Sequence, residues 1–102
     1  MDRVYPKYRK RPIDTEAVQV RPSIWSWREC LDFLQIDEEY ITHGAMTKIA
    51  KDGGIEVPTR VGMMKAAFGD YIVRGIIGDY FVSPAAEFEK YYEKVEEEVP
   101  NV

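Results

Sequence analysis

The spacing of hydrophobic residues changes along this chain, and the change separates helical from extended segments. In the first half, four apolar residues recur at i, i+3, i+4 and i+7: Trp27, Cys30, Leu31 and Leu34. This spacing places them on one face of an amphipathic helix. Ser26 and Glu29 match a capping box, in which a serine oxygen and a glutamate carboxylate bond to free backbone N–H groups. The pattern predicts a helix that Ser26 caps and that ends near Gln35.

Short apolar runs bounded by turn residues predict strands on both sides of this helix. One candidate, residues 15–20, precedes the helix, and the others lie at 47–50, 55–57, 61–65, 71–74 and 80–82. Asp52-Gly53-Gly54 separates two of them, and glycine adopts the positive φ angles that a tight hairpin turn requires. The regular spacing predicts an antiparallel meander. Residues 38–41 are predicted to form a helical turn that Gly44 ends.

A second helix is predicted after the strands. Ser83 is in the position of an N-cap, and Pro84 is in the first helical position, where its missing N–H costs nothing. The predicted apolar face of this helix consists of Ala85, Phe88, Tyr92 and Val95. The order of elements predicts an α+β fold: an antiparallel β-meander of about four to five short strands, a helix in the N-terminal half, a C-terminal helix, and helix cover on one face of the sheet.

The charges lie mainly at the two ends of the chain. We expect one domain over residues 1–102, with a basic arm over 1–12 and an acidic tail over 96–102 that frays. The arm carries five basic residues and Asp2, a net charge of +4, whereas residues 87–98 carry six glutamates and two lysines, a net charge of −4. We interpret both as solvated ends. The pI near 5.0 disfavours a nucleic-acid partner, because phosphate binding depends on positive charge.

Membrane insertion and export are not expected from this composition. No apolar run reaches the roughly 18 residues that a membrane helix needs. The single cysteine, Cys30, cannot form an internal disulfide framework. We therefore expect a cytoplasmic protein without membrane contact.

One short motif occurs twice. Gly-Asp-Tyr is found at 69–71 and again at 78–80, nine residues apart. If adjacent strands brought Asp70 and Asp79 together, the carboxylates could divide acid and base roles. Turn chemistry explains the same residues more simply: glycine makes the bend, aspartate bonds to the backbone of the turn, and Tyr71 and Tyr80 begin strands. We favour the turn interpretation and keep these four residues as tentative binding residues.

Other reactive residue types lack the neighbours that catalysis requires. His43 is the single histidine and has no partner at a metal-ligand spacing, and Cys30 lies on the predicted helix face, where a small core residue is expected. No glycine-rich phosphate loop or nucleophile elbow is present. The sequence predicts a protein that is not an enzyme and that uses neither a metal nor a cofactor.

An aliphatic pair forms the remaining candidate site. Ile76 and Ile77 are bracketed by Gly75 and Gly78, where a hairpin tip is predicted and polar residues are usual. The pair packs inside the monomer, marks an interface, since exposed aliphatic residues occur at binding surfaces, or is simply exposed, since single surface isoleucines are common.

Three blocks of the chain carry a resemblance to a known family. They are residues 8–12 (YRKRP) with 16–19 (EAVQ), the tryptophan-led segment 25–33, and 68–75 (FGDYIVRG) with 78–81 (GDYF) and 88–92 (FEKYY). This order resembles a small uncharacterised family of tailed phages and prophages, whose members open with YRKKPV…EAVQ and close with PGDYIIRG…GEFY…FEKTYE. The chain departs from that pattern at Phe68, where proline is usual, and lacks the cysteine of the family's PCKPD segment.

The resemblance implies a phage-type origin and a shared compact fold, but no reaction. Together with the missing catalytic sets, it leads us to expect a non-enzymatic phage accessory protein in the cytoplasm of the infected cell. Its expected partner is a host or phage protein, with a homodimer left open. A small-ligand or nucleotide-binding protein is the alternative.

Overall fold

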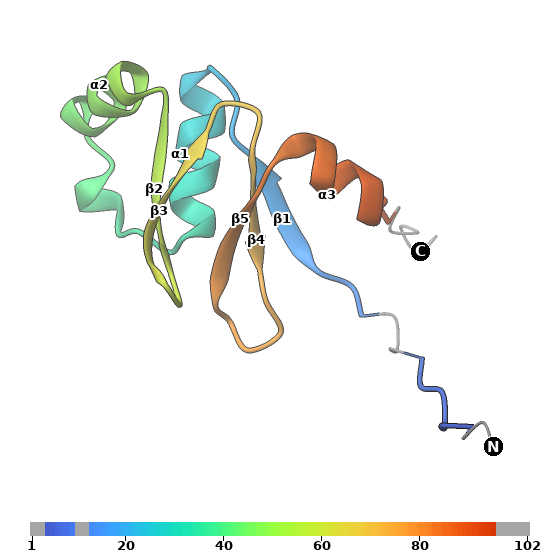
Figure 1. The fold of residues 1–102 in the computed structure, drawn as a ribbon. Coiled ribbons are helices and arrows are strands. Elements are labelled where there is room, and N and C mark those ends of the chain that lie inside the picture. Colours follow the sequence, from blue (N-terminus) through green and yellow to red (C-terminus); the bar gives the residue numbers. More distant parts are fainter. Residues whose placement is uncertain (1–3, 10–12, 96–102) are drawn as a thin grey trace, which may run out of the picture.

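The computed structural model describes residues 4–9 and 13–95, and within them it confirms the predicted α+β class. The elements follow one another as β1 (Glu16–Gln19), α1 (Ile24–Phe33), a 3₁₀ turn (Glu38–Tyr40), α2 (His43–Asp52), β2 (Gly54–Thr59), β3 (Gly62–Ala67), β4 (Tyr71–Arg74), β5 (Tyr80–Ser83) and α3 (Ala85–Tyr91) (Figure 1). The described part thus contains three α-helices and five strands. The predicted turn at 38–41 corresponds to the 3₁₀ turn.

All strands pair antiparallel, in two separate sheets. β2 and β3 form one hairpin, and the other sheet has the order β1-β4-β5. In the larger sheet Val18 lies opposite Ile72, and Ile72 lies opposite Val82, so a strand from the start of the chain pairs with one near its end. The β2–β3 hairpin packs against β5. The predicted run of short antiparallel strands is therefore present as two hairpins, with β1 added to the second.

The larger sheet has a helix on each face. Ile72 is fully buried in the core beside Trp27 and Cys30 of α1. Its neighbour Tyr71 stacks instead on Phe88 of α3, with ring centroids 4.0 Å apart. Because successive side chains of a strand point to opposite faces, α1 and α3 cover opposite faces. The prediction of helix cover on one face is wrong.

The N-terminus of α1 differs from the predicted capping box. Ser23 is the N-cap, and its hydroxyl accepts a hydrogen bond from the Ser26 N–H at 3.2 Å. The Ser26 hydroxyl accepts from the Arg21 N–H at 2.8 Å and donates to the Gln19 carbonyl at 3.1 Å. Ser26 therefore joins the end of β1 to α1 instead of capping the helix. The helix ends at Phe33, close to the predicted boundary.

The predicted strand at 47–50 is wrong, because these residues belong to α2. Thr42 caps this helix by accepting from the Ala45 N–H at 3.1 Å, and Gly44, predicted to end a turn, lies inside it. Gly53, at a φ of 70°, ends the helix in the left-handed conformation that favours glycine at this position. Asp52-Gly53-Gly54 is thus a helix terminus and not a hairpin turn.

The C-terminal helix is confirmed with different boundaries. Pro84 occupies the N-cap position, whereas Ser83 is still the last residue of β5, so the predicted serine cap is wrong. The helix ends at Tyr91, and Val95, predicted on its apolar face, is exposed. The predicted tail at 96–102 lies outside the described residues, as do positions 1–3 and 10–12 of the predicted arm.

One hydrophobic cluster holds α1, α2 and both sheets together. Its buried members are Val20, Trp27, Cys30, Leu34, Met46, Ile49, Ile55, Val57, Ala66 and Ile72. The predicted helix face is confirmed at Trp27, Cys30 and Leu34, with Leu31 half-buried at its margin. By packing on the same cluster, α1 and α2 are held side by side with a hollow between their outward surfaces.

Candidate functional site

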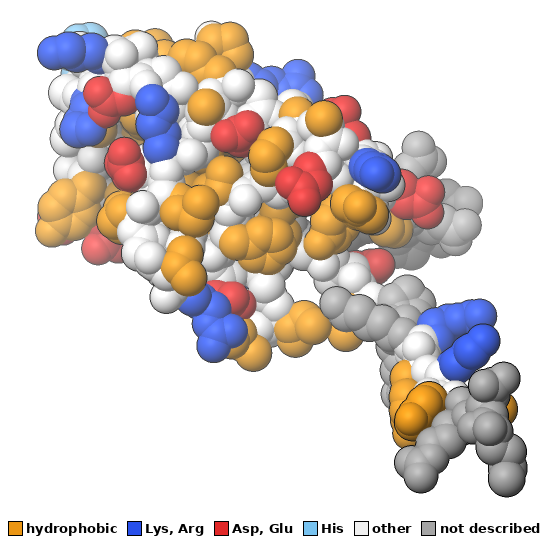
Figure 2. Space-filling model, viewed as in Figure 1, with side chains coloured by type: hydrophobic (Ala, Val, Ile, Leu, Met, Phe, Trp, Pro, Cys, Tyr) orange, Lys and Arg blue, Asp and Glu red, His pale blue; other side chains and the backbone are white. Residues whose placement is uncertain are grey.

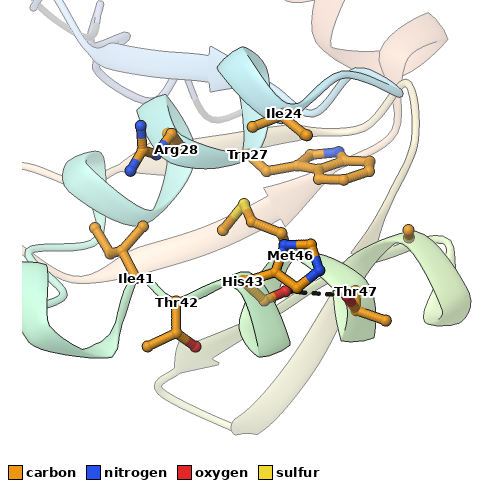
Figure 3. A pocket seen from close by; sticks show the side chains of 9 residues that line it. Ile24, Trp27, Arg28, Ile41, Thr42, His43, Met46 and Thr47 are labelled. Atoms are coloured by element: carbon orange, nitrogen blue, oxygen red, sulfur yellow. Dashed lines mark hydrogen bonds between the residues drawn. The ribbon is translucent and has the colours of Figure 1, made fainter.

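A groove lies between α1 and α2 (Figure 3). Its lining consists of Ile24, Trp27, Arg28, Ile41, Thr42, His43, Met46, Thr47 and Ala50. The volume of about 490 Å³ lies within the range of roughly 300–1,000 Å³ that is usual for ligand sites. We call this feature the α1–α2 groove.

Helical spacing brings the lining residues together. On α1 they stand at i, i+3 and i+4, and on α2 at i, i+3, i+4 and i+7, so each helix contributes one stripe of its surface. Trp27 and Met46 are buried, whereas Ile24 remains 54% exposed. Figure 3 shows Ile24 and Trp27 on one wall, with His43, Met46 and Thr47 on the other.

The groove is apolar with one cation at its rim. Arg28 is the only lining residue with a formal charge at neutral pH. The two ion pairs of the described residues join Lys48 to Asp52 and Arg74 to Glu16, so Arg28 takes part in neither. Thr47 donates its hydroxyl proton to the His43 carbonyl at 3.0 Å, which occupies that hydroxyl within the helix. The groove therefore offers hydrophobic contact and one guanidinium, with the polar side chains of Thr42 and His43 at the start of α2.

The two Gly-Asp-Tyr units lie far apart. Tyr71 pairs with Ser83 and Arg74 with Tyr80, so Asp70 and Asp79 flank opposite ends of β4. A strand of this length spans about 13 Å at roughly 3.3 Å per residue. The two carboxylates therefore do not form an acid–base pair.

Each aspartate belongs to a turn, as the simpler interpretation predicts. The Asp70 carboxylate accepts a hydrogen bond from the Ala67 N–H at 3.0 Å. The Asp79 carboxylate lies against the Cα of Gly75, whose N–H donates to the Asp79 carbonyl at 2.6 Å. The predicted bond from the aspartate side chain to the backbone is thus present at Asp70, whereas Asp79 closes its turn through its backbone carbonyl.

The two tyrosines face opposite sides of the sheet. Tyr71 stacks on α3 and donates its hydroxyl proton to Glu89 at 3.2 Å; burial, and then the carboxylate of Glu89, raise the pKa of Tyr71. Tyr80 donates to the Phe33 carbonyl at 2.9 Å on the α1 side, where the Arg74 guanidinium lies 4.4 Å from the centroid of the Phe33 ring. The tentative binding residues are thus distributed over two ends and two faces of the sheet.

Ile76 and Ile77 form the tip of the β4–β5 hairpin. They lie in a turn in which the Gly78 N–H donates to the Gly75 carbonyl at 3.0 Å. Their side chains are 74% and 73% exposed. Packing inside the monomer, one of the three alternatives from the sequence, is therefore excluded. Ile76 lines a second hollow, of about 340 Å³, with Ile13 and Arg74.

The sequence-based interpretation missed the groove, although it considered two residues close to it. His43, considered from the sequence only as a metal ligand, is the first residue of α2 and lines the groove. The helical spacing of His43, Met46, Thr47 and Ala50 was the signal that could have shown this. Cys30 is buried in the core, as expected, and burial raises the pKa of its thiol to about 11.

Residues 4–9 and 13–95 contain neither a metal-binding cluster nor a membrane-spanning helix. They contain no group of three or more histidine, cysteine, aspartate or glutamate side chains arranged to hold a metal ion. No helix in the same residues is long and apolar enough to cross a membrane.

Comparison with known proteins finds no match for this chain among protein-family models, curated proteins or solved structures. The fold and the groove thus define the class by themselves: a small α+β domain with an apolar groove between two helices. The resemblance to the tailed-phage family stays a prediction from the sequence.

Proposed function

We propose that this protein acts by binding another protein, a segment of which docks in the α1–α2 groove. The observation that carries the proposal is the apolar groove with Arg28 alone at its rim. Apolar contacts supply most of the affinity at such a site. A guanidinium pairs well with a carboxylate because it can donate two parallel hydrogen bonds. The partner segment therefore carries large apolar side chains beside an aspartate or glutamate.

The first turn of α1 supports protein binding for a second reason. Trp25, the neighbour of Ile24, is 80% exposed, and it gains nothing from that exposure. Tryptophan is enriched among the residues that dominate the binding energy of protein interfaces. Burial of Trp25 and Ile24 against a partner would add to the contacts inside the groove.

The family resemblance extends this proposal to the biological setting. A phage accessory role in the cytoplasm of the infected cell would make the partner a host or phage protein. This part rests on the resemblance of the three sequence blocks, and it does not depend on the geometry of the groove.

The experiment compares groove variants with a matched control. Tagged wild-type protein, Ile24→Ser, Arg28→Glu and the control Ile76→Ser are used in pull-downs from bacterial lysate, with mass spectrometry of the captured proteins. Ile24 and Ile76 are both exposed, so the folded domain is expected to tolerate either change. We expect one stoichiometric protein to bind wild type and Ile76→Ser, with at least about tenfold weaker binding, about 1.4 kcal/mol, to both groove variants. Equal capture by all four proteins, or no stoichiometric capture by wild type, would contradict the proposal.

A small ligand is the second candidate, because the groove volume also suits one. Native mass spectrometry of the purified protein separates the two functions. A small molecule that co-purifies with wild type and is lost from Ile24→Ser, without a protein partner, would replace protein binding by ligand binding.

A further inference from the structure

Three aromatic rings form a parallel stack on the face of the sheet that α3 covers. The Tyr71 and Phe88 rings lie 4.0 Å apart at 15°, and the Phe88 and Tyr92 rings 4.6 Å apart at 10°. We call these three residues the aromatic ladder. Tyr92 is 42% exposed, and the neighbouring Tyr91 is more exposed still. The ladder therefore ends in aromatic side chains that are exposed to solvent.

Glutamates are interspersed with Lys90 and Lys94 around the ladder residues in the sequence, and Glu89 accepts a hydrogen bond from the Tyr71 hydroxyl at 3.2 Å. Glu87 and Glu89 flank Phe88 in α3, and Glu93 follows Tyr92. They belong to the stretch 87–98, whose net charge is −4. Figure 2 shows acidic side chains beside hydrophobic ones over the region of α3. This surface suits a partner that presents aromatic and cationic groups together.

The N-terminal arm of the same chain has those properties. Residues 4–9 have no regular secondary structure, and they lie apart from the body in Figure 1. Within them Tyr5 and Tyr8 are exposed, the latter at 92%, and Lys7 and Arg9 are the only charged residues. Figure 2 shows hydrophobic and basic side chains together on this arm. Pro6 restricts the backbone next to Tyr5, which lowers the entropy cost of docking in an extended form.

We propose that the arm of one molecule docks on the aromatic ladder of a second copy of this chain. Tyr5 and Tyr8 stack against the exposed aromatic surface, since offset-stacked rings attract one another. Lys7 and Arg9 lie against the glutamates of α3. Each copy has one arm and one ladder, so two copies form two equivalent contacts in a closed dimer with twofold symmetry.

The charge near the ladder and the exposure of the arm favour the arm of a second copy over two other occupants, a nucleic acid and the arm of the same molecule. A nucleic acid would be attracted by the arm but repelled by the glutamates beside the ladder, because its backbone is anionic. The arm of the same molecule does not fill the site, since Tyr8 keeps nearly all of its surface exposed. The ladder is built from β4 and α3, whereas the groove is built from α1 and α2, so this proposal does not depend on the proposed function.

The oligomeric state of the full chain tests the proposal. Sedimentation velocity from about 1 μM to about 1 mM should show a shift from 11.9 kDa towards twice that mass. Replacing both arm tyrosines, Tyr5→Ser and Tyr8→Ser, should weaken the dimer at least about tenfold. Tyr40→Ser is the matched control, because Tyr40 is also an exposed tyrosine but lies in the 3₁₀ turn; it should leave the dimer unchanged.

A charge exchange gives the sharper result. Lys7→Glu with Arg9→Glu in the arm, or Glu87→Lys with Glu93→Lys at the ladder, should each abolish the dimer, because like charges then meet. An equimolar mixture of the two double variants should restore it as a heterodimer, since both contacts are again complementary. A monomer at every concentration would overturn the proposal. A dimer that the arm variants leave intact would also overturn it. The same holds if the arm binds only the ladder of its own molecule, or only an added oligonucleotide.

Discussion

Trp27 belongs both to the hydrophobic core and to the lining of the α1–α2 groove. It lines the groove, and its ring stacks on Phe68 with the centroids 5.8 Å apart at 12°. Its Nε1 is buried and has no hydrogen-bond acceptor among the described residues. The contribution of Trp27 to stability therefore comes from packing, and its indole N–H adds none.

Substitutions of Trp27 should distinguish packing from hydrogen bonding. We expect Trp27→Ala to lower the free energy of unfolding by about 3–5 kcal/mol, as for other buried large aromatic residues. Trp27→Phe should cost clearly less, because it keeps a ring and removes a donor that has no acceptor. Urea denaturation gives both values. Trp25→Ala is the control and should stay within about 0.5 kcal/mol of wild type; coincident midpoints for Trp27→Ala and wild type would contradict the assigned helix face.

Cys30 should make stability depend on pH at alkaline values. Burial raises the pKa of its thiol from 9.0 to about 11, although the hydrogen bond with Ser26 acts in the opposite direction. The unfolded chain loses this proton near pH 9, before the folded protein does. The stabilisation is therefore complete below pH 9 and is lost as the pH rises towards 11, by about 2–3 kcal/mol at most. Urea denaturation of wild type and Cys30→Ala should show their stability difference shrinking above pH 9; a constant difference would contradict this.

The misassigned helix cap shows how far single residues can be interpreted from the sequence. Ser23 and Ser26 are the same residue type three positions apart, and both precede apolar residues at helical spacing. Only the fold shows that the Ser26 hydroxyl is already bonded to Gln19 of β1. The hydrogen bond between Ser26 and Gln19 thus leaves Ser23 as the helix cap. A local sequence pattern contains no information about such a contact between two elements.

Among the elements, α2 is the one whose type the sequence concealed. It contains glycine and threonine, which have modest helix propensity, and residues 47–50 alone fit a short strand. The helix is determined by the caps at Thr42 and Gly53 and by burial of Met46 and Ile49. Most helix stability in proteins comes from such packing and not from propensity. The groove was missed for the same reason, since α2 forms one of its walls.

The two consecutive glycines after α2 should respond differently to alanine. Gly53 has a φ of 70° with open space where a Cβ would lie, so Gly53→Ala should cost about 1 kcal/mol through backbone strain. At Gly54 a Cβ would overlap the Ala66 carbonyl on the paired strand β3, which cannot move without breaking the hairpin. Gly54→Ala should cost about 2–3 kcal/mol. Thermal unfolding gives the order, and Gly53→Asn is the control because asparagine tolerates positive φ. Equal losses at Gly53 and Gly54 would contradict this assignment.

For the whole molecule, the fold class and all five strands could be predicted, but the arrangement in space could not. The repeated Gly-Asp-Tyr motif suggested two neighbouring carboxylates. Consecutive antiparallel strands begin at opposite ends of a sheet, so equivalent positions before β4 and β5 are separated by a full strand length. The pairing of β1 with β4 had no local signal either. Alternation in a strand specifies which face is buried, but not which strand lies alongside.

That pairing of β1 with β4 also imposes an order on folding. Each hairpin closes a short loop, whereas α1, α2 and the whole β2–β3 hairpin lie between Val18 and Ile72 in the chain. Contacts between residues so far apart in the chain form late and slow the overall rate. Until β1 arrives, β4 presents an unpaired edge of backbone N–H and C=O groups, which is a template for another strand. We therefore expect that, during refolding at high concentration, β1 of one molecule pairs with β4 of another. The product is a strand-exchanged dimer. It should not form when native protein is simply diluted without being unfolded.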